Sequence, residues 1–186
     1  MRVLISGGTG FIGVQLANSL IETGNEVICL TRNKQKAIDS IPLVHDIHQI
    51  DVASKIPPKS IFSNVDAVIN LTGKRIPGIW TNRAKQSILD TRIQSTLNLV
   101  ASMKRTEVKV FISGSALGIY GDRGEEHLTE ASNEGSGFLA NVCKQWEEAA
   151  QNFEGRLVLV RSGHVIGNGG LMGPMRRIAN LGLLGK

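Results

Sequence analysis

The spacing of three glycines near the N-terminus constrains the fold of this chain more than any other feature. Residues 3–5 form a short apolar run typical of a buried strand, and a helical pattern begins at Phe11. Gly7, Gly10 and Gly13 lie between and just after them, at intervals of three. In a strand–turn–helix unit, such glycines permit the tight turn, let the backbone approach a pyrophosphate, and let the helix pack closely on the strand. We therefore expect phosphates at the helix N-terminus, with an ordinary glycine-rich turn as the alternative.

The rest of the chain alternates between strand and helix patterns. The expected strands are residues 3–5, 26–30, 48–52, 66–71, 108–113 and 157–161, and the expected helices are 11–23, 33–39, 81–104 and 139–153. Continuous apolar strands of this kind are typical of a parallel sheet covered on both faces. The pattern predicts an α/β fold with a doubly wound parallel sheet of Rossmann type, whose ligand lies at the carboxyl ends of the strands.

Composition argues against several other classes of protein. Hydrophobic residues make up 41% of the chain and charged residues 20%, as in ordinary globular domains. No apolar run approaches the roughly 20 residues needed to span a bilayer, and no signal peptide is visible, so we expect a cytoplasmic protein without membrane contact. Cys29 and Cys143 are interpreted as small core residues. The four histidines share no spacing typical of a metal site.

The net charge of +5 does not indicate a nucleic-acid partner. Lysines and arginines are spread in pairs, without a basic run and with few aromatic residues for base stacking. A site for one anionic small molecule explains the positive bias equally well.

Residues after the second and third expected strands indicate which cofactor would bind. A cofactor with a free ribose 2′-hydroxyl usually meets an acid about 20 residues past the glycine turn, but this chain has Thr31 and Arg32 there. A guanidinium can grip a 2′-phosphate, so Arg32 predicts NADP(H), with a solvated surface arginine as the alternative. Asp51 could reach the adenine amino group or be an ordinary loop acid.

Together, several motifs resemble the extended short-chain dehydrogenase/reductase superfamily. Within it, the chain is similar to an atypical subgroup described as sugar-nucleotide epimerase-like or cell-division-inhibitor-like. The motifs are Gly7-Gly-Thr-Gly-Phe-Ile-Gly13, Thr31-Arg32, Asn70-Leu-Thr-Gly73, Trp80, Ser113-Gly-Ser-Ala-Leu-Gly-Ile-Tyr-Gly-Asp122, Trp146-Glu147 and Arg161-Ser-Gly-His-Val-Ile-Gly167. The resemblance implies bound NADP(H), which agrees with the interpretation of Arg32.

The catalytic residues of that superfamily are only partly present. The superfamily uses a Ser or Thr after the fifth strand, which Ser115 matches, and a Tyr-x-x-x-Lys pair on the next helix. Gly137 and Asn141 stand where that pair would be, and the single tyrosine, Tyr120, is followed four residues later by Gly124. The usual proton donor is therefore missing. Tyr120 could act as an acid, contact the substrate or simply pack as an aromatic residue.

Two further positions are indicated by the resemblance. Arg92 stands where the superfamily often has Asn; it could face the cofactor or an anionic substrate group, or form a surface salt bridge. His164 lies where nicotinamide or substrate contacts are found, although a lone histidine is more often structural. The predicted catalytic residues are Ser115 and Tyr120. The predicted cofactor residues are Gly7, Thr9, Gly10, Phe11, Ile12, Gly13, Thr31, Arg32, Asp51, Leu71, Thr72, Gly73, Arg92 and His164.

These observations predict an oxidoreductase or epimerase that transfers hydride to or from a small polar carbonyl or hydroxyl compound. The alternative is a non-catalytic NADP(H)-binding or redox-sensing module. Residues 1–167 are expected to form the Rossmann domain, and residues 168–186 the start of a truncated C-terminal substrate-binding region, unless the protein has dispensed with that region. The apolar residues from Leu171 onward would then be disordered or buried in a contact with a second copy, so a homo-oligomer is possible.

Overall fold

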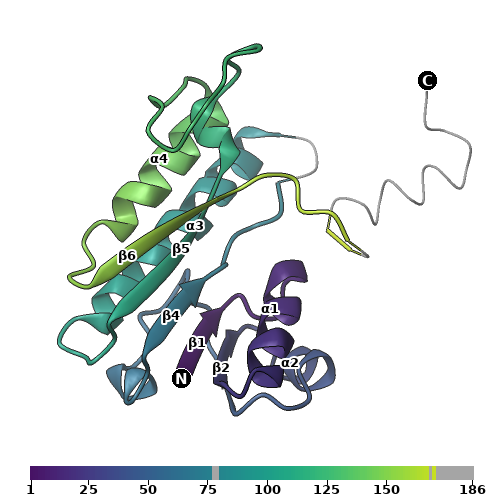
Figure 1. Cartoon of the computed structure of the whole chain (residues 1–186), viewed down its shortest axis with the longest axis vertical. Coiled ribbons are helices and arrows are strands. Elements are labelled where there is room, and N and C mark those ends of the chain that lie inside the picture. The colour runs from purple at the N-terminus through teal and green to yellow at the C-terminus, as the bar shows by residue number, and fades with distance from the viewer. Residues whose placement is uncertain (77–79, 168, 171–186) are drawn as a thin grey trace, which may run out of the picture.

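A computed structural model describes residues 1–76, 80–167 and 169–170 of the chain. Its six strands form one parallel sheet in the order β3-β2-β1-β4-β5-β6 (Figure 1). The strands are β1 (Arg2–Ser6), β2 (Glu26–Thr31), β3 (Asp46–Gln49), β4 (Ala67–Asn70), β5 (Val110–Ala116) and β6 (Arg156–Ser162). The helices are α1 (Phe11–Glu22), α2 (Lys34–Ser40), α3 (Asn82–Met103) and α4 (Phe138–Ala150), with short 3-10 helices η1 (Lys59–Phe62) and η2 (Leu117–Tyr120). The predicted doubly wound parallel sheet is confirmed.

Helices cover both faces of the sheet because neighbouring residues of β1 point to opposite sides. Leu4 belongs to the core cluster that contains Leu99 of α3. Val3 and Ile5 belong to the second cluster, with Ala17 of α1. Leu4 and Ile5 are fully buried, and each such side chain contributes about 1.5–3 kcal/mol of hydrophobic stabilisation. Burial on both faces explains why the central strands are continuously apolar.

The third strand differs from its expected position. The sequence predicts residues 48–52, whereas β3 is Asp46–Gln49. Its last residue pairs with Thr31, where β2 also ends. Beyond this point the Asp51 carboxylate accepts a hydrogen bond from the backbone N–H of Ala53, so the chain enters a turn and leaves the sheet.

The predicted domain division meets the end of the described chain. The six-stranded sheet and its helices lie between Arg2 and Ser162, and the expected domain bounds of 1–167 stay a prediction. The expected substrate-binding region, residues 168–186, lies outside the described residues except for Gly169 and Gly170. Among the helices of the described part, none is both long and apolar enough to cross a membrane.

Candidate functional site

The strand order makes the carboxyl ends of β1 and β4 the place where ligands bind in open α/β sheets. From β1 the chain continues into α1 on one face of the sheet, and from β4 it continues into α3 on the other, which makes this pair the topological switch point. The two strand ends are joined directly, since the Ser6 and Thr72 hydroxyls are hydrogen-bonded at 2.7 Å. The structure thus brings together the glycine turn and the predicted residues after β4.

Backbone atoms leave no room for a side chain at two glycines in and after this turn. Gly7 has φ +79°, and a Cβ there would lie 2.8 Å from the Leu71 carbonyl carbon. A Cβ on Gly13 would lie 2.5 Å from the Gly7 carbonyl oxygen. Gly13 was expected to allow packing of the helix on the strand, and in the structure the carbonyls of the turn itself fill that space. The turn therefore brings the N-terminus of α1 under the end of β1.

The N-terminus of α1 is suited to an anion. Gly10 caps the helix without a side-chain hydrogen bond, and the first turn contains no acidic residue. The backbone N–H groups of Phe11, Ile12 and Gly13 have no acceptor within the described part of the chain. Free amides and the helix dipole together favour a phosphate here. The residues present fit the dinucleotide that the glycine spacing predicts.

The end of β2 is tied to this turn. The Thr9 and Thr31 hydroxyls lie 3.2 Å apart, within hydrogen-bonding distance, and Thr31 is buried. Arg32 follows on the exposed surface, with its carbonyl accepting a hydrogen bond from Gln49 at 3.2 Å. The Arg32 guanidinium forms no ion pair with the described residues. It is therefore available at this end of the sheet, while the Asp51 carboxylate is occupied in its own turn with Ala53 and Ser54.

A threonine that the sequence did not single out as a site residue connects β4 to both helices of the opposite face. Asn70 accepts a hydrogen bond from the backbone N–H of Thr72 and donates one to the Thr96 hydroxyl at 2.9 Å. Trp146 of α4 donates to the same hydroxyl at 3.1 Å. Thr96 in turn donates to the Arg92 carbonyl. Thr96 was not among the predicted site residues, and its role in joining these elements became visible only in the tertiary structure.

Arg92 is buried rather than exposed on the surface. Its side chain lies under the loop after β4, where Nη1 donates to the carbonyls of Lys74 and Ile88 at 3.0 and 3.1 Å. Its guanidinium carbon is 5.2 Å from the centre of the Trp146 ring, a cation–π contact. Because residue Arg92 is only 9% exposed and pairs with no carboxylate of the described residues, the surface salt-bridge alternative is wrong.

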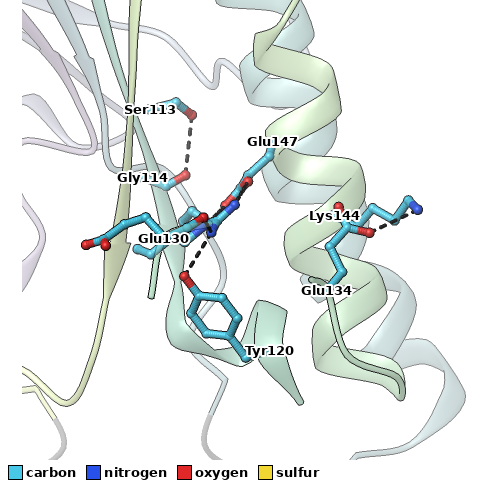
Figure 2. A network of polar contacts seen from close by, with 9 residues as sticks. Ser113, Gly114, Tyr120, Glu130, Glu134, Lys144 and Glu147 are labelled. Atoms are coloured by element: carbon cyan, nitrogen blue, oxygen red, sulfur yellow. Dashed lines mark hydrogen bonds and ion pairs between the residues drawn. The ribbon is translucent and has the colours of Figure 1, made fainter. Parts of the chain in front are cut away.

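Ser115 and Tyr120, the predicted catalytic residues, belong to one network of polar contacts, in which Figure 2 labels Tyr120 and Glu147. Ser115, at the end of β5, donates to the Glu147 carboxylate at 2.5 Å. Arg161 of β6 binds both oxygens of that carboxylate, at 2.9 and 2.8 Å. Arg161 also donates to the Tyr120 hydroxyl at 2.9 Å and to the Glu130 carbonyl at 3.0 Å. The two candidates are therefore linked through an ion pair.

The electrostatics of this network keep Glu147 ionised. Burial alone would raise the pKa of the Glu147 carboxyl, but hydrogen bonds from Arg161 and Ser115 outweigh it, so the pKa lies below its ordinary value. Hydrogen bonds to Glu147 and then Tyr120 raise the pKa of Arg161. Sequence reasoning noted Glu147 and Arg161 only as motif residues. One feature of the sequence could have indicated a role for Glu147. It follows Trp146 on α4 and lies among the buried residues of that helix, which are otherwise apolar.

The remaining candidates do not join this network. His164 is exposed in the segment after β6. Gly137, at one position of the missing Tyr-x-x-x-Lys pair, caps α4 with φ +99°, and Asn141 is exposed on the first turns of that helix. The described residues also gather no three His, Cys, Asp or Glu side chains in a way that could hold a metal ion.

Comparison with known protein families identifies the same fold and cofactor class. Residues 3–180 match the model of the NAD dependent epimerase/dehydratase family. The chain is 33% identical over 186 residues to epimerase family protein Mb2239 of Mycobacterium bovis, covering 97% of this chain and 60% of that protein. It is 32% identical to epimerase family protein YfhF of Bacillus subtilis, covering 92% and 57%. The chain thus spans less than two thirds of the length of these relatives.

Solved structures give the same result. Human epimerase family protein SDR39U1 (isoform 2), crystallised with NADPH, has a TM-score of 0.80 and 30% identity, covering 98% of this chain and 61% of that one. UDP-glucuronic acid 4-epimerase from Bacillus cereus, in complex with NAD, has a TM-score of 0.73 over 90% of this chain and 58% of its own. At 21% identity, this second likeness concerns the fold alone.

Proposed function

Since the chain belongs to the NAD dependent epimerase/dehydratase family, we propose that it binds NADP(H) and catalyses hydride transfer with a small polar carbonyl or hydroxyl compound. The observation that carries this proposal is the glycine turn beside Arg32. The free amides of Phe11, Ile12 and Gly13 would hold the pyrophosphate, and Thr72 and Gly73 would lie beside the ribose or nicotinamide. When bound, the nicotinamide would supply or accept the hydride.

Arg32 supports NADP(H) over NAD(H). It occupies the position where an acid would bind the ribose 2′-hydroxyl, and an acid there would repel a 2′-phosphate. The Arg32 guanidinium is exposed and unpaired among the described residues, so it is free to bind the phosphate bidentately. The NADPH in the human SDR39U1 structure agrees with this choice, while other structural relatives carry NAD.

The hydrogen-bond directions in the network support distinct roles for Ser115 and Tyr120. The Ser115 hydroxyl has one proton, which it donates to Glu147, so toward a ligand it can only accept. The Tyr120 oxygen accepts from Arg161 and keeps its own proton available. We therefore assign Tyr120 as the general acid for a carbonyl oxygen and Ser115 as the acceptor of a substrate hydroxyl.

A non-catalytic NADP(H)-binding or redox-sensing role is the second candidate. The observation that favours it is α4, where Gly137 and Asn141 replace the usual Tyr and Lys. In this case the cofactor would bind with the same preference, but Tyr120 would serve packing only. Its 6% exposure and its contacts with Ile119 and Cys143 are compatible with such a role.

Titration of NADPH fluorescence against the purified chain tests the proposal. We expect saturable binding that is lost in Gly10→Val, because a branched side chain at the N-cap of α1 would crowd the turn, where even a Cβ would lie 3.1 Å from the Gly7 carbonyl oxygen. Lys109→Ala, at a site beside Asp66 and remote from the glycine turn, is the matched control. Failure of the wild-type chain to bind NADPH or NADH would refute the proposal. Binding without turnover of any carbonyl compound would favour the second candidate.

A further inference from the structure

The environment of Arg92 is unusual for a buried charge. Residue Arg92 is nine-tenths buried, and burial lowers the pKa of its guanidinium. No described carboxylate lies within ion-pair distance of it. Residues 77–79, 168 and 171–186, outside the described part, contain no Asp or Glu. A buried charge normally has an ionic partner, and a carboxylate of a ligand is one group that could supply it.

The hydrogen bonds that Arg92 does form leave one edge of the guanidinium open. Nη1 is occupied by the carbonyls of Lys74 and Ile88. Within the described residues, Nε and Nη2 have no hydrogen-bond acceptor, and neither atom is fully buried. These two nitrogens form the side of the guanidinium whose parallel N–H groups match the two oxygens of a carboxylate.

The position of Arg92 along the sheet distinguishes this ligand from the cofactor phosphates. A Cβ on Gly73, at the end of β4, would lie 3.0 Å from the guanidinium carbon. Trp146, which stacks on Arg92, also lies against Gly114 of β5, where a Cβ would be 3.2 Å from the indole ring. Arg92 therefore sits beside the ends of β4 and β5. The phosphate-binding features, the glycine turn and Arg32, belong to β1 and β2, on the other side of the switch point.

We infer that Arg92 binds a carboxylate of the substrate through Nε and Nη2, so that the substrate class is a small carbonyl or hydroxyl compound carrying an acid group. This assignment rests on the proposed function, because it takes the phosphates of NADP(H) to occupy the glycine turn. Gly73 is part of the site, since a larger residue there would press on the guanidinium. Trp146 and the carbonyls of Lys74 and Ile88 position the charge.

Trp146 provides a direct readout of the site. The chain has two tryptophans, so Trp80→Phe leaves Trp146 as the only one, in contact with Arg92. In that protein, with NADP⁺ present, pyruvate is titrated against pyruvamide, which is neutral and of similar shape. We expect pyruvate to change the Trp146 fluorescence saturably and to bind about 10- to 150-fold more tightly than pyruvamide, as for hydrogen bonds to a charged group.

Two variants complete the experiment. Arg92→Gln in the same background should abolish the preference for the acid, whereas Arg83→Gln, exposed near the start of the same helix, should keep it. No response to pyruvate, or equal responses to acid and amide, would overturn the inference. If Arg92→Gln does not fold, the comparison of pyruvate with pyruvamide in the Trp80→Phe protein still tests whether the site prefers a carboxylate.

NADPH binding is measured on the same proteins to separate the two proposals. We expect its Kd to be unchanged in a folded Arg92→Gln protein. Arg92→Gln could instead lose NADPH affinity while the Trp80→Phe protein shows no preference for pyruvate over pyruvamide. This result would assign Arg92 to the cofactor and overturn the inference. If NADPH does not bind the unsubstituted chain at all, the proposed function fails, whatever the response to pyruvate.

Discussion

Ser115 and Glu147, which are far apart in the sequence, are hydrogen-bonded at 2.5 Å in the folded chain, with the serine as donor. The carboxylate is held ionised by Arg161, which binds both of its oxygens. The direction of the Ser115 proton is fixed as a result. Glu147 thus joins β5, β6 and α4 at the carboxyl end of the sheet.

Replacing Glu147 with Gln should destabilise the protein. The change leaves Arg161 without its ionic partner, and breaking a buried pair costs ~3–5 kcal/mol. The Arg161 side chain keeps 21% exposure, so we expect about 2–3 kcal/mol at neutral pH. Urea unfolding followed by circular dichroism measures the change. Glu134→Gln, which breaks the exposed pair with Lys144 shown in Figure 2, is the control and should cost less than about 1 kcal/mol.

The stabilisation by Glu147 should depend on pH in a defined direction. Its folded pKa is below its ordinary value, so the unfolded chain takes up the proton first as the pH falls. The contribution is therefore complete above about pH 4.3 and is lost as the pH falls from there through the folded pKa. The difference in unfolding free energy between wild type and Glu147→Gln should shrink in that window. A difference that stays constant from neutral to strongly acidic pH would contradict the assignment.

Tyr120→Phe should separate catalysis from packing. Without a Tyr-x-x-x-Lys pair, ordinary aldehydes and sugar nucleotides should react slowly even with saturating NADPH. If Tyr120 is the acid, the variant should lower the remaining rate by about 10²–10⁴-fold. Stopped-flow measurement of NADPH oxidation gives the rate, and an unchanged NADPH Kd shows that the site is intact. An unchanged rate would exclude Tyr120 from proton transfer.

Arg32→Ala should reduce the preference for NADPH over NADH. Loss of hydrogen bonds to a charged phosphate corresponds to roughly 10- to 150-fold in Kd. Because Arg32 is exposed, salt screening should bring the effect toward the lower end. Fluorescence titration of both reduced cofactors measures the ratio, and NADH affinity should hardly change. Equal affinities in the wild type would refute the assignment, and an unchanged ratio in the variant would transfer the role to Lys34 or Lys36.

Gly13→Ala should damage the cofactor site through packing alone. The new Cβ would lie 2.5 Å from the Gly7 carbonyl oxygen and 2.7 Å from that of Gly8, so the turn or α1 must move. Overpacking of this kind costs about 1–3 kcal/mol, and we expect NADPH binding to weaken with it. Gly118→Ala is the matched control, since its Cβ would meet Leu139 at an ordinary 3.4 Å. Thermal unfolding and NADPH titration should leave the control unchanged.

The sequence by itself determined the fold and predicted where a cofactor would bind. Glycine spacing and the alternation of apolar runs depend on local geometry, so Gly7, Gly13 and the strand β1 could be placed without a structure. The same holds for Arg32, because its distance from the glycine turn follows from the βαβ unit. The limits of β3 were less certain, since they depend on where the neighbouring β2 ends.

Only the tertiary structure decided how the polar side chains pair. Periodicity says that a residue faces inward, but not which strand or helix it meets there. Glu147 meets Ser115 and Arg161 because β5 and β6 are paired in register, with Ser115 opposite Arg161, and α4 lies over them. Arg92 is likewise buried beside Trp146 because α3 and α4 share one face of the sheet. Such contacts join residues distant in the sequence, and the packing of the whole domain fixes them.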